Sequence, residues 1–252
     1  MRRVGHKGAD LIAPGNTLAS FDAALATGID MIEFDVLPER PDHARAARSR
    51  PSRSRSRRRR EAGALLLAHD YEDAARRSPC TLEEALAYLS SERFKEIELD
   101  VDLKLPGYEP RVLEALRAHR LLDRALISSQ YRSSLTVLRA AAPRVRLGWS
   151  VPKLRRDPFR TRALALPAAA AVYAARAILP MRAARALRAR DCDALMVHWR
   201  LVTHRLVQSV RRTGGELYVW TVDELPRLRA LEALGVTGVI TNDPRLFAAL
   251  AA

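Results

Sequence analysis

The sequence predicts a (β/α)8 barrel, which we infer from three observations. Short runs typical of β-strands alternate with longer stretches whose apolar residues recur at helical spacing. The main runs and the helical stretches between them fit within the 252 residues of the chain, as one barrel requires. No glycine-rich dinucleotide fingerprint follows any run, and this argues against an open, doubly wound sheet. We therefore expect residues 1–252 to form a single barrel domain.

The elements follow from local patterns. A short run at 65–69 lies in the long connection after the second strand. We expect a helix at 17–27 with Asn16 as its N-cap, and another at 81–90, where Thr81 and Glu84 form a capping box. The expected barrel strands are residues 3–6, 31–37, 97–104, 125–130, 146–151, 194–199, 217–222 and 237–241.

The formal net charge of +14 comes largely from two segments. Residues 40–60 carry ten arginines and one acid, with Pro and Ser but no apolar periodicity, so we expect a disordered insertion within the barrel. Residues 153–190 mix alanine, leucine and arginine instead. This second segment predicts helix, interrupted at Pro167 and Pro180.

The composition also predicts the cellular compartment of the protein. No apolar run approaches the roughly 20 residues that span a bilayer. Arg2-Arg3 is not followed by the apolar segment of a secretory signal, so we expect a cytoplasmic protein. Cys80 and Cys192 stand in no metal or redox spacing and suggest no disulfide framework.

In a barrel of this kind, active sites lie where strands end and loops begin. Several polar side chains of this sequence fall at those points. Glu33 and Asp35 are two residues apart near the end of the second strand, so they point to the same side. The other rim residues are His6, His69-Asp70, Asp100, Asp102, Lys104, Ser129, Gln130, Trp220 and Thr241-Asn242-Asp243.

The acidic pair predicts a metal site. Two inward carboxylates in an apolar strand repel each other and are costly to bury. A hard divalent cation, Mg²⁺ or Ca²⁺, removes both problems, and Asp102 on the neighbouring strand is a candidate third ligand. Lys104 beside these acids indicates an anionic substrate. One such cation, a lysine and two histidines suit phosphodiester cleavage, with proton transfer by the histidines.

Six blocks of the sequence resemble, in order, those of glycerophosphodiester phosphodiesterases. The blocks are "VGHKGADLIAPGNTLASFDAAL", "IDMIEFDV", "LLLAHD", "VDLK", "YVWTVD" and "GVTGVITNDP". The resemblance implies a barrel enzyme with one divalent cation that hydrolyses glycerophosphodiesters to glycerol phosphate and an alcohol. It implies that His6 and His69 are the acid–base pair and that Glu33, Asp35 and Asp102 are the metal ligands.

The resemblance also implies which residues contact substrate, with three departures from the family pattern. Lys7 is the expected phosphate contact and stands where the family usually has arginine; Lys104 and Trp220 complete the expected substrate contacts. Gly15 stands where the family usually has glutamate, and Asp102 is one methylene shorter than the usual glutamate. The substrate we expect is a small phosphodiester, with its alcohol left open.

Two alternatives stay open. One is a phospholipase-D-like hydrolysis of lysolipids, helped by contact of residues 160–190 with an anionic membrane. The other is nucleic-acid binding through the arginine-rich insertion at 40–60, which could neutralise phosphates. That insertion has no interleaved aromatic residues, so we expect no specific recognition of nucleic acid.

Overall fold

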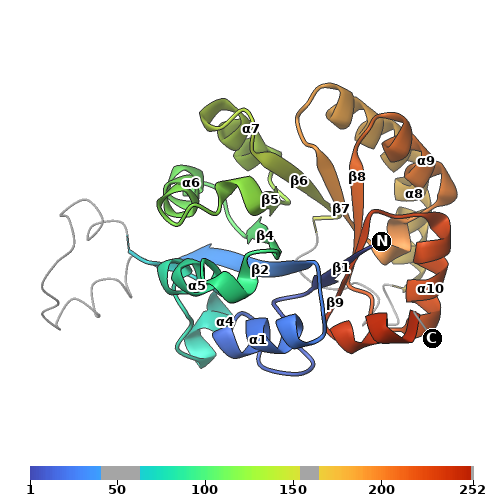
Figure 1. Cartoon of the computed structure of the whole chain (residues 1–252). Helices are drawn as coiled ribbons and strands as arrows, with labels where there is room; N and C mark the ends of the chain where they lie inside the picture. The colour runs from blue at the N-terminus through green and yellow to red at the C-terminus, as the bar shows by residue number, and fades with distance from the viewer. Residues whose placement is uncertain (41–62, 154–164, 251–252) are drawn as a thin grey trace, which may run out of the picture.

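A closed barrel of parallel strands forms the centre of the molecule (Figure 1). The computed structural model describes residues 1–40, 63–153 and 165–250. Strands pair in the order β1-β9-β8-β7-β6-β5-β4-β2, and pairing of β1 with both β9 and β2 closes the ring. The predicted barrel is confirmed. Its strands are β1 Arg2–Gly5, β2 Met31–Pro38, β4 Glu98–Leu103, β5 Ala125–Ser129, β6 Arg146–Val151, β7 Ala194–His198, β8 Glu216–Trp220 and β9 Gly238–Thr241.

Helices surround the barrel and return the chain to the start of each next strand (Figure 1). The short strand β3, Leu65–Leu66, pairs antiparallel to the end of β2 and leads into the first of two α-helices before β4. A 3-10 helix, η6, spans Trp199–Leu201, and another, η7, spans Pro244–Leu250. The α-helices are α1 Leu18–Ala26, α4 Tyr71–Arg76, α5 Leu82–Leu89, α6 Glu109–Ala118, α7 Arg132–Ala141, α8 Ala165–Arg188, α9 His204–Arg212 and α10 Leu225–Leu234.

The helix starts confirm one predicted cap and correct the other. Thr81 caps α5, and Glu84 completes the capping box as expected. Helix α1 begins after Thr17, whose hydroxyl accepts from the backbone N–H of Ser20, so the prediction of Asn16 as N-cap was wrong. Asn16 lies in the left-handed region, with φ +59°, and its side chain is used elsewhere.

Helix α8 also differs from the prediction. It runs without a break from Ala165 to Arg188, through Pro167 and with Pro180 in its interior. A proline there removes one helical hydrogen bond, at a cost of about 3 kcal/mol. Burial of Leu179, Ala183 and Leu187 on the side that packs against the barrel offsets that cost, because helices in proteins are stabilised mainly by tertiary packing.

The barrel interior is packed solid. Side chains from the strands alone form a buried apolar layer: Val4, Met31, Leu126, Ala194, Met196, Tyr218 and Ile240. Below it, at the amino ends of the strands, Arg146 binds Glu98 and Glu216, each at 2.7 Å, and Arg2 pairs with Glu98 as well. This floor leaves the carboxyl ends of the strands as the place where polar groups can meet a ligand.

Two predicted segments fall partly or mostly outside the described residues. Of the predicted insertion at 40–60, the structure describes Arg40 alone; of the basic segment at 153–190, residues 154–164 lie outside the description. Within the ranges that are described, no helix is both long and apolar enough to cross a membrane.

Candidate active site

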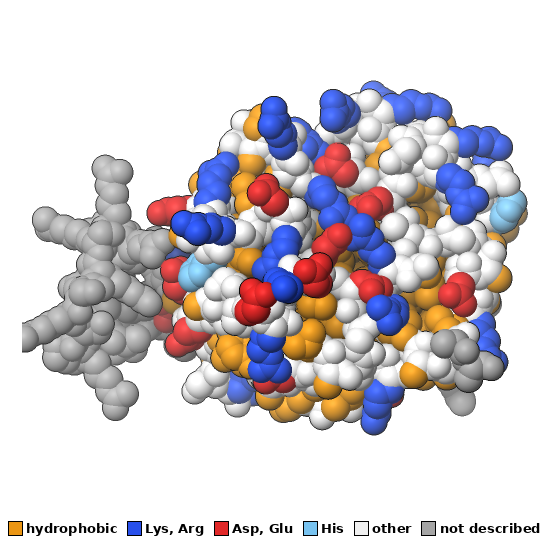
Figure 2. Space-filling model, viewed as in Figure 1, with side chains coloured by type: hydrophobic (Ala, Val, Ile, Leu, Met, Phe, Trp, Pro, Cys, Tyr) orange, Lys and Arg blue, Asp and Glu red, His pale blue; other side chains and the backbone are white. Residues whose placement is uncertain are grey.

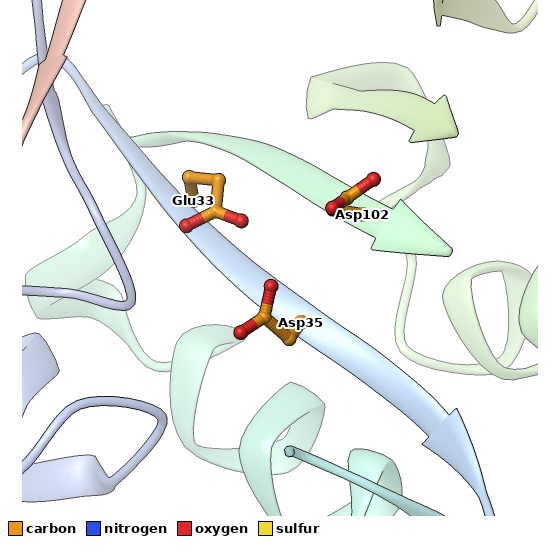
Figure 3. Close-up of side chains that lie close together, drawn as sticks. All are labelled: Glu33, Asp35 and Asp102. Carbon is orange, nitrogen blue, oxygen red and sulfur yellow. The ribbon is translucent and has the colours of Figure 1, made fainter. Parts of the chain in front are cut away.

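Three acidic side chains converge at the carboxyl ends of β2 and β4 (Figure 3). Glu33 and Asp35 project from β2 to the same side, and Asp102 stands on β4 in register with Asp35. One carboxylate oxygen from each lies within 4.8 Å of the others, and all three residues are buried. The strand register therefore brings together the three acids that the sequence placed at one rim.

Lys104 follows β4 and lies between two of these acids. Its Nζ is 2.5 Å from Asp102 Oδ2 and also pairs with Asp35 Oδ1. The buried Asp35 Oδ1 accepts no hydrogen bond within the described part of the chain, so this ammonium is its counter-charge. Burial raises the pKa of Asp35. The positive charges of Lys104, and then of Lys7, lower it by more, so the net pKa lies below its usual range.

The remaining acids are less well neutralised. Burial, and then the charge of Asp35, raise the pKa of Glu33 well above its usual value despite the opposing effect of Lys104. Burial, and then the charge of Asp102, raise the pKa of Asp100 to about 8, although Ser128 Oγ donates to Asp100 Oδ1 at 2.7 Å. These buried acids thus share Lys104 as their counter-charge. A further positive charge at the cluster would be stabilised by the acids that Lys104 does not neutralise.

A divalent cation fits this donor set. Mg²⁺ and Ca²⁺ prefer carboxylate oxygens about 2.0–2.6 Å away, and oxygens arranged around one such ion lie about 3–5 Å apart. The separation of Glu33, Asp35 and Asp102 meets that condition. The Asp35 oxygen that lacks a hydrogen-bond donor and the raised pKa of Glu33 are both relieved by a cation at this point.

Asn16 positions Asp35 and was missed as a site residue. Its amide donates from Nδ2 to Asp35 Oδ2 at 2.9 Å and accepts at Oδ1 from the backbone N–H of Asp35 at 3.0 Å. These two bonds hold the carboxylate on the inner side of β2. The signal in the sequence was asparagine after Pro14-Gly15, since asparagine tolerates the left-handed conformation that Asn16 adopts.

His6 lies at the end of β1 with its ring fixed by two further residues. Its Nδ1 is 2.5 Å from Asn242 Oδ1, which can only accept, so Nδ1 carries a proton. Asn242 Nδ2 in turn donates to Asp223 Oδ2 at 2.7 Å, which sets the orientation of the amide. His6 Nε2 faces Glu33 Oε2 at 3.8 Å. Burial, and then Lys7, lower the pKa of His6, which favours a neutral ring with a free lone pair on Nε2.

The loop after His6 places Lys7 beside the acids. Lys7 has φ +51°, and its backbone N–H donates to Glu33 Oε2 at 2.8 Å. Gly15 explains one departure from the family pattern. A β-carbon there would lie 2.4 Å from Asp10 Oδ1, which already accepts from the Gly15 N–H at 2.8 Å. Asp10 Oδ2 lies 3.7 Å from Lys7 Nζ, so Asp10 supplies an acidic group where this chain lacks a glutamate.

His69 follows β3 and leads into α4. Its side chain is 53% exposed, and Nδ1 lies 3.1 Å from Asp70 Oδ2. Asp70 caps α4, and Asp73 accepts from the backbone N–H of His69 at 3.1 Å. Because β3 pairs with the end of β2, the strand that carries Glu33 and Asp35, His69 lies on the same side of the barrel as these acids. An Nδ1–H bonded to Asp70 leaves Nε2 open to solvent.

The expected substrate residue Trp220 lies across the barrel from the acids. It ends β8 in register with His198 on β7, and their rings meet edge to face at 5.1 Å. His198 also stacks on Trp199 in η6, at 5.5 Å between ring centres. The mouth therefore has a charged side and an aromatic side, and the sequence identified Trp220 on the second but missed His198.

The family model of glycerophosphoryl diester phosphodiesterases matches residues 6–37 and 76–246, which is most of the chain. The chain belongs to this family. The resemblance inferred from the six blocks is confirmed, and with it the expected class of enzyme. His6 and all residues of the acidic cluster lie within the two matched ranges. His69 lies in the gap between these two ranges.

Relatives of this family member extend over nearly the whole chain. A glycerophosphodiester phosphodiesterase from Caldanaerobacter subterraneus is 23% identical over 96% of this chain and 93% of its own length. An Arabidopsis thaliana glycerophosphodiester phosphodiesterase, GDPD4, is 27% identical over 97% of this chain and 71% of its own length.

Solved structures share the fold. An Oleispira antarctica phosphodiesterase in complex with the product sn-glycerol-3-phosphate superimposes with a TM-score of 0.68 at 19% identity, covering 100% of this chain and 97% of that one. A glycerophosphodiester phosphodiesterase from Thermotoga maritima gives a TM-score of 0.61 at 17% identity, covering 99% and 98%. These similarities support the barrel assignment made from the strand pairing.

Proposed function

We propose that this protein hydrolyses glycerophosphodiesters to glycerol phosphate and an alcohol, using a divalent cation held by Glu33, Asp35 and Asp102. The observation that carries the proposal is the buried three-acid cluster beside His6, at the mouth of a barrel of this family. The product-bound Oleispira antarctica relative supports glycerol phosphate as a product. The cation, Mg²⁺ or Ca²⁺, supplies Lewis-acid stabilisation of negative charge on the phosphate oxygens.

His6 is the proton acceptor in this proposal. Its Nδ1–H is held by Asn242, so the Nε2 lone pair is the one directed to the mouth. A lowered pKa keeps that nitrogen unprotonated at neutral pH, as a general base requires. His6 Nε2 accepts the proton of the attacking hydroxyl, which belongs either to water or to the glycerol of the substrate.

His69 is the proton donor to the leaving alkoxide. Asp70 Oδ2 lies 3.1 Å from Nδ1 and orients the ring, and in this proposal Nε2 carries the proton to be delivered. The exposed position of His69 suits a leaving group that departs through the open mouth. The resemblance to the family supports this assignment of roles.

Three side chains bind and orient the substrate. Lys7 and Lys104 supply positive charge for the phosphate, and Lys104 also balances Asp35 and Asp102. Trp220 packs against the carbon skeleton of the glycerol or the alcohol on the aromatic side of the mouth.

A panel of glycerophosphodiesters and lysophospholipids, assayed with the full chain, tests the proposal. We expect release of glycerol phosphate from the soluble diesters, loss of activity in excess EDTA, and recovery on adding Mg²⁺ or Ca²⁺. Unchanged hydrolysis in excess EDTA would contradict the metal site. Hydrolysis of lysolipids in preference to soluble diesters would favour the phospholipase-D-like alternative, and no hydrolysis by metal-loaded protein would overturn both.

A further inference from the structure

The outer face of α8 carries apolar and basic side chains together. At 100° per residue, one side of this helix collects Tyr173, Ile178 and Met181, which are 78%, 48% and 69% exposed. At the same spacing, Arg185 falls between Met181 and Ile178, and Arg182 falls beside Ile178 at the edge of the exposed face opposite Tyr173; both arginines are exposed. Exposed large apolar side chains gathered on one face are unusual on a soluble surface and indicate a binding partner.

The charge of this face is not neutralised by neighbouring acids. Helices α8 and α9 contain no aspartate or glutamate. Elsewhere, exposed arginines pair with carboxylates, as in Arg3–Asp30, Arg132–Asp191 and Arg245–Asp243. Within the described residues, no carboxylate pairs with the arginines of the outer face or of the groove beside it, which are Arg182, Arg185, Arg188, Arg205 and Arg212. Figure 2 shows Lys and Arg side chains gathered at the upper right edge, where Figure 1 draws α9.

A groove between α8 and α9 adds a place for an anion. It has a volume of about 240 Å³, and Met181, Arg188, Arg205 and Arg212 line it. Among the described residues, Arg212 donates only to Gln208 Oε1, at a long 3.4 Å, which leaves further guanidinium donors for a ligand. The groove thus has an apolar edge at Met181 and three arginines along its lining. The arginines suit the phosphate headgroup of a lipid, and the apolar edge suits its acyl chain.

We propose that the outer face of α8, with the groove against α9, docks on a bilayer that contains anionic lipids. The residues of this docking face are Tyr173, Ile178, Met181, Arg182, Arg185, Arg188, Arg205 and Arg212. An interfacial helix combines arginines that contact anionic headgroups with apolar side chains that enter the acyl boundary, and this face has both. A nucleic acid would use the arginines but not the exposed isoleucine and methionine.

Docking there would hold the mouth of the barrel close to the bilayer. Arg176 Nε donates to the carbonyl of Arg200 at 2.8 Å, and Arg200 lies in η6, directly after the carboxyl end of β7. Helix α8 runs from the mouth toward the floor, so Tyr173, which precedes Arg176, lies at or beyond the level of the mouth. The docking face stands independently of the proposed hydrolysis.

Vesicle co-sedimentation of the full chain tests the docking face. We expect binding to phosphatidylcholine vesicles containing about 30% phosphatidylserine, and little binding to pure phosphatidylcholine, near physiological salt (about 0.15 M). Replacing Arg182, Arg185 and Arg188 together by Gln should lower the partition coefficient at least about tenfold. The matched control replaces Arg117, Arg120 and Arg144 by Gln, which removes the same charge from exposed positions on the α6–α7 side.

A second variant separates a membrane from a generic polyanion. Ile178→Ser with Met181→Ser keeps every charge and should weaken vesicle binding several-fold, while leaving heparin binding unchanged. Circular dichroism and thermal unfolding confirm that each variant folds. Equal vesicle binding by wild type and the α8 arginine variant would overturn the proposal, as would an equal loss in the control variant. Loss of heparin and vesicle binding together in the apolar variant would also overturn it.

Discussion

The floor of the barrel holds charged side chains that are half-buried, the mouth holds charged side chains that are buried, and their charges are balanced in opposite ways. At the floor, Glu98 pairs with Arg2 and Arg146, and Glu216 pairs with Arg146. At the mouth, Glu33, Asp35, Asp100 and Asp102 share Lys104. Balanced charge at the floor holds the strands together, whereas the excess of acid at the mouth is the feature that binding of a cation would relieve.

Protonation behaviour reflects the same difference. Burial would raise the pKa of Glu98, but hydrogen bonds from Arg2 and Arg146 outweigh it, and the net pKa lies below its usual value. At the mouth, burial and then a neighbouring carboxylate raise the pKa of Glu33 and of Asp100. Glu98 at the floor is thus stabilised as an anion, whereas Glu33 and Asp100 at the mouth are destabilised as anions; among the mouth acids, Lys104 keeps the pKa of Asp35 low.

The largest expected effect comes from removing a proton-transfer group at the mouth. His6→Ala or His69→Ala should lower kcat about 10²–10⁴-fold, because each removes one member of the proposed acid–base pair. Steady-state hydrolysis of a soluble glycerophosphodiester measures the loss. His119→Ala is the matched control, since His119 lies at the end of α6 and pairs with Glu83. Near wild-type turnover by the His69 variant would remove His69 from the proposed role of acid.

One substitution made in both regions sharpens the comparison. Glu33→Gln should lower kcat/KM about 10²-fold or more by removing a proposed ligand of the cation, yet raise the free energy of unfolding in EDTA by about 1 kcal/mol. Glu98→Gln should do the reverse, lowering stability while leaving kcat unchanged. Urea denaturation in EDTA gives the stabilities. A loss of stability in both variants would show that the mouth acids are no less balanced than those of the floor.

Breaking the floor should cost stability alone. Arg146→Met leaves Glu216 without its partner and weakens the hold on Glu98, so we expect a loss of about 1–3 kcal/mol in the free energy of unfolding. The kcat of the folded fraction should stay within about twofold of wild type. A large fall in kcat with unchanged stability would assign the floor a catalytic role.

The smallest expected effect is a pH dependence from the floor. Because the pKa of Glu98 is lowered in the folded state, its contribution to stability is present above its ordinary pKa of 4.5. That contribution is lost as pH falls below 4.5 and through the lower folded pKa. Urea titrations from about pH 6 to about pH 3, compared with Glu98→Gln, should differ by about 1 kcal/mol or less. Parallel profiles would contradict the assigned shift.

The barrel and the acidic cluster were predictable because both follow from simple periodicity. Alternation along β2 places Glu33 and Asp35 on one side, and the parallel register brings Asp102 to them. The predicted fold is confirmed; the catalytic and ligand roles of these residues stay predictions.

What sequence reasoning missed depends on contacts between distant segments. Asn16 was assigned to a helix cap, but its amide holds Asp35, nineteen residues further along. Asp223 orients Asn242, and through it His6, by bonds that join the two ends of the chain. Helix α8 continues through Pro180 because it packs against the barrel. Helix propensity, which depends on the local sequence alone, does not include that packing.

The packed interior also constrains the route by which molecules enter and leave during the proposed turnover. With the layer around Met31 and Tyr218 buried and the floor closed by Arg146, the barrel has no passage to its opposite end within the described residues. Substrate, water and both products must therefore use the same opening. Whichever hydroxyl attacks, the alcohol and glycerol phosphate both leave through the opening by which the substrate entered.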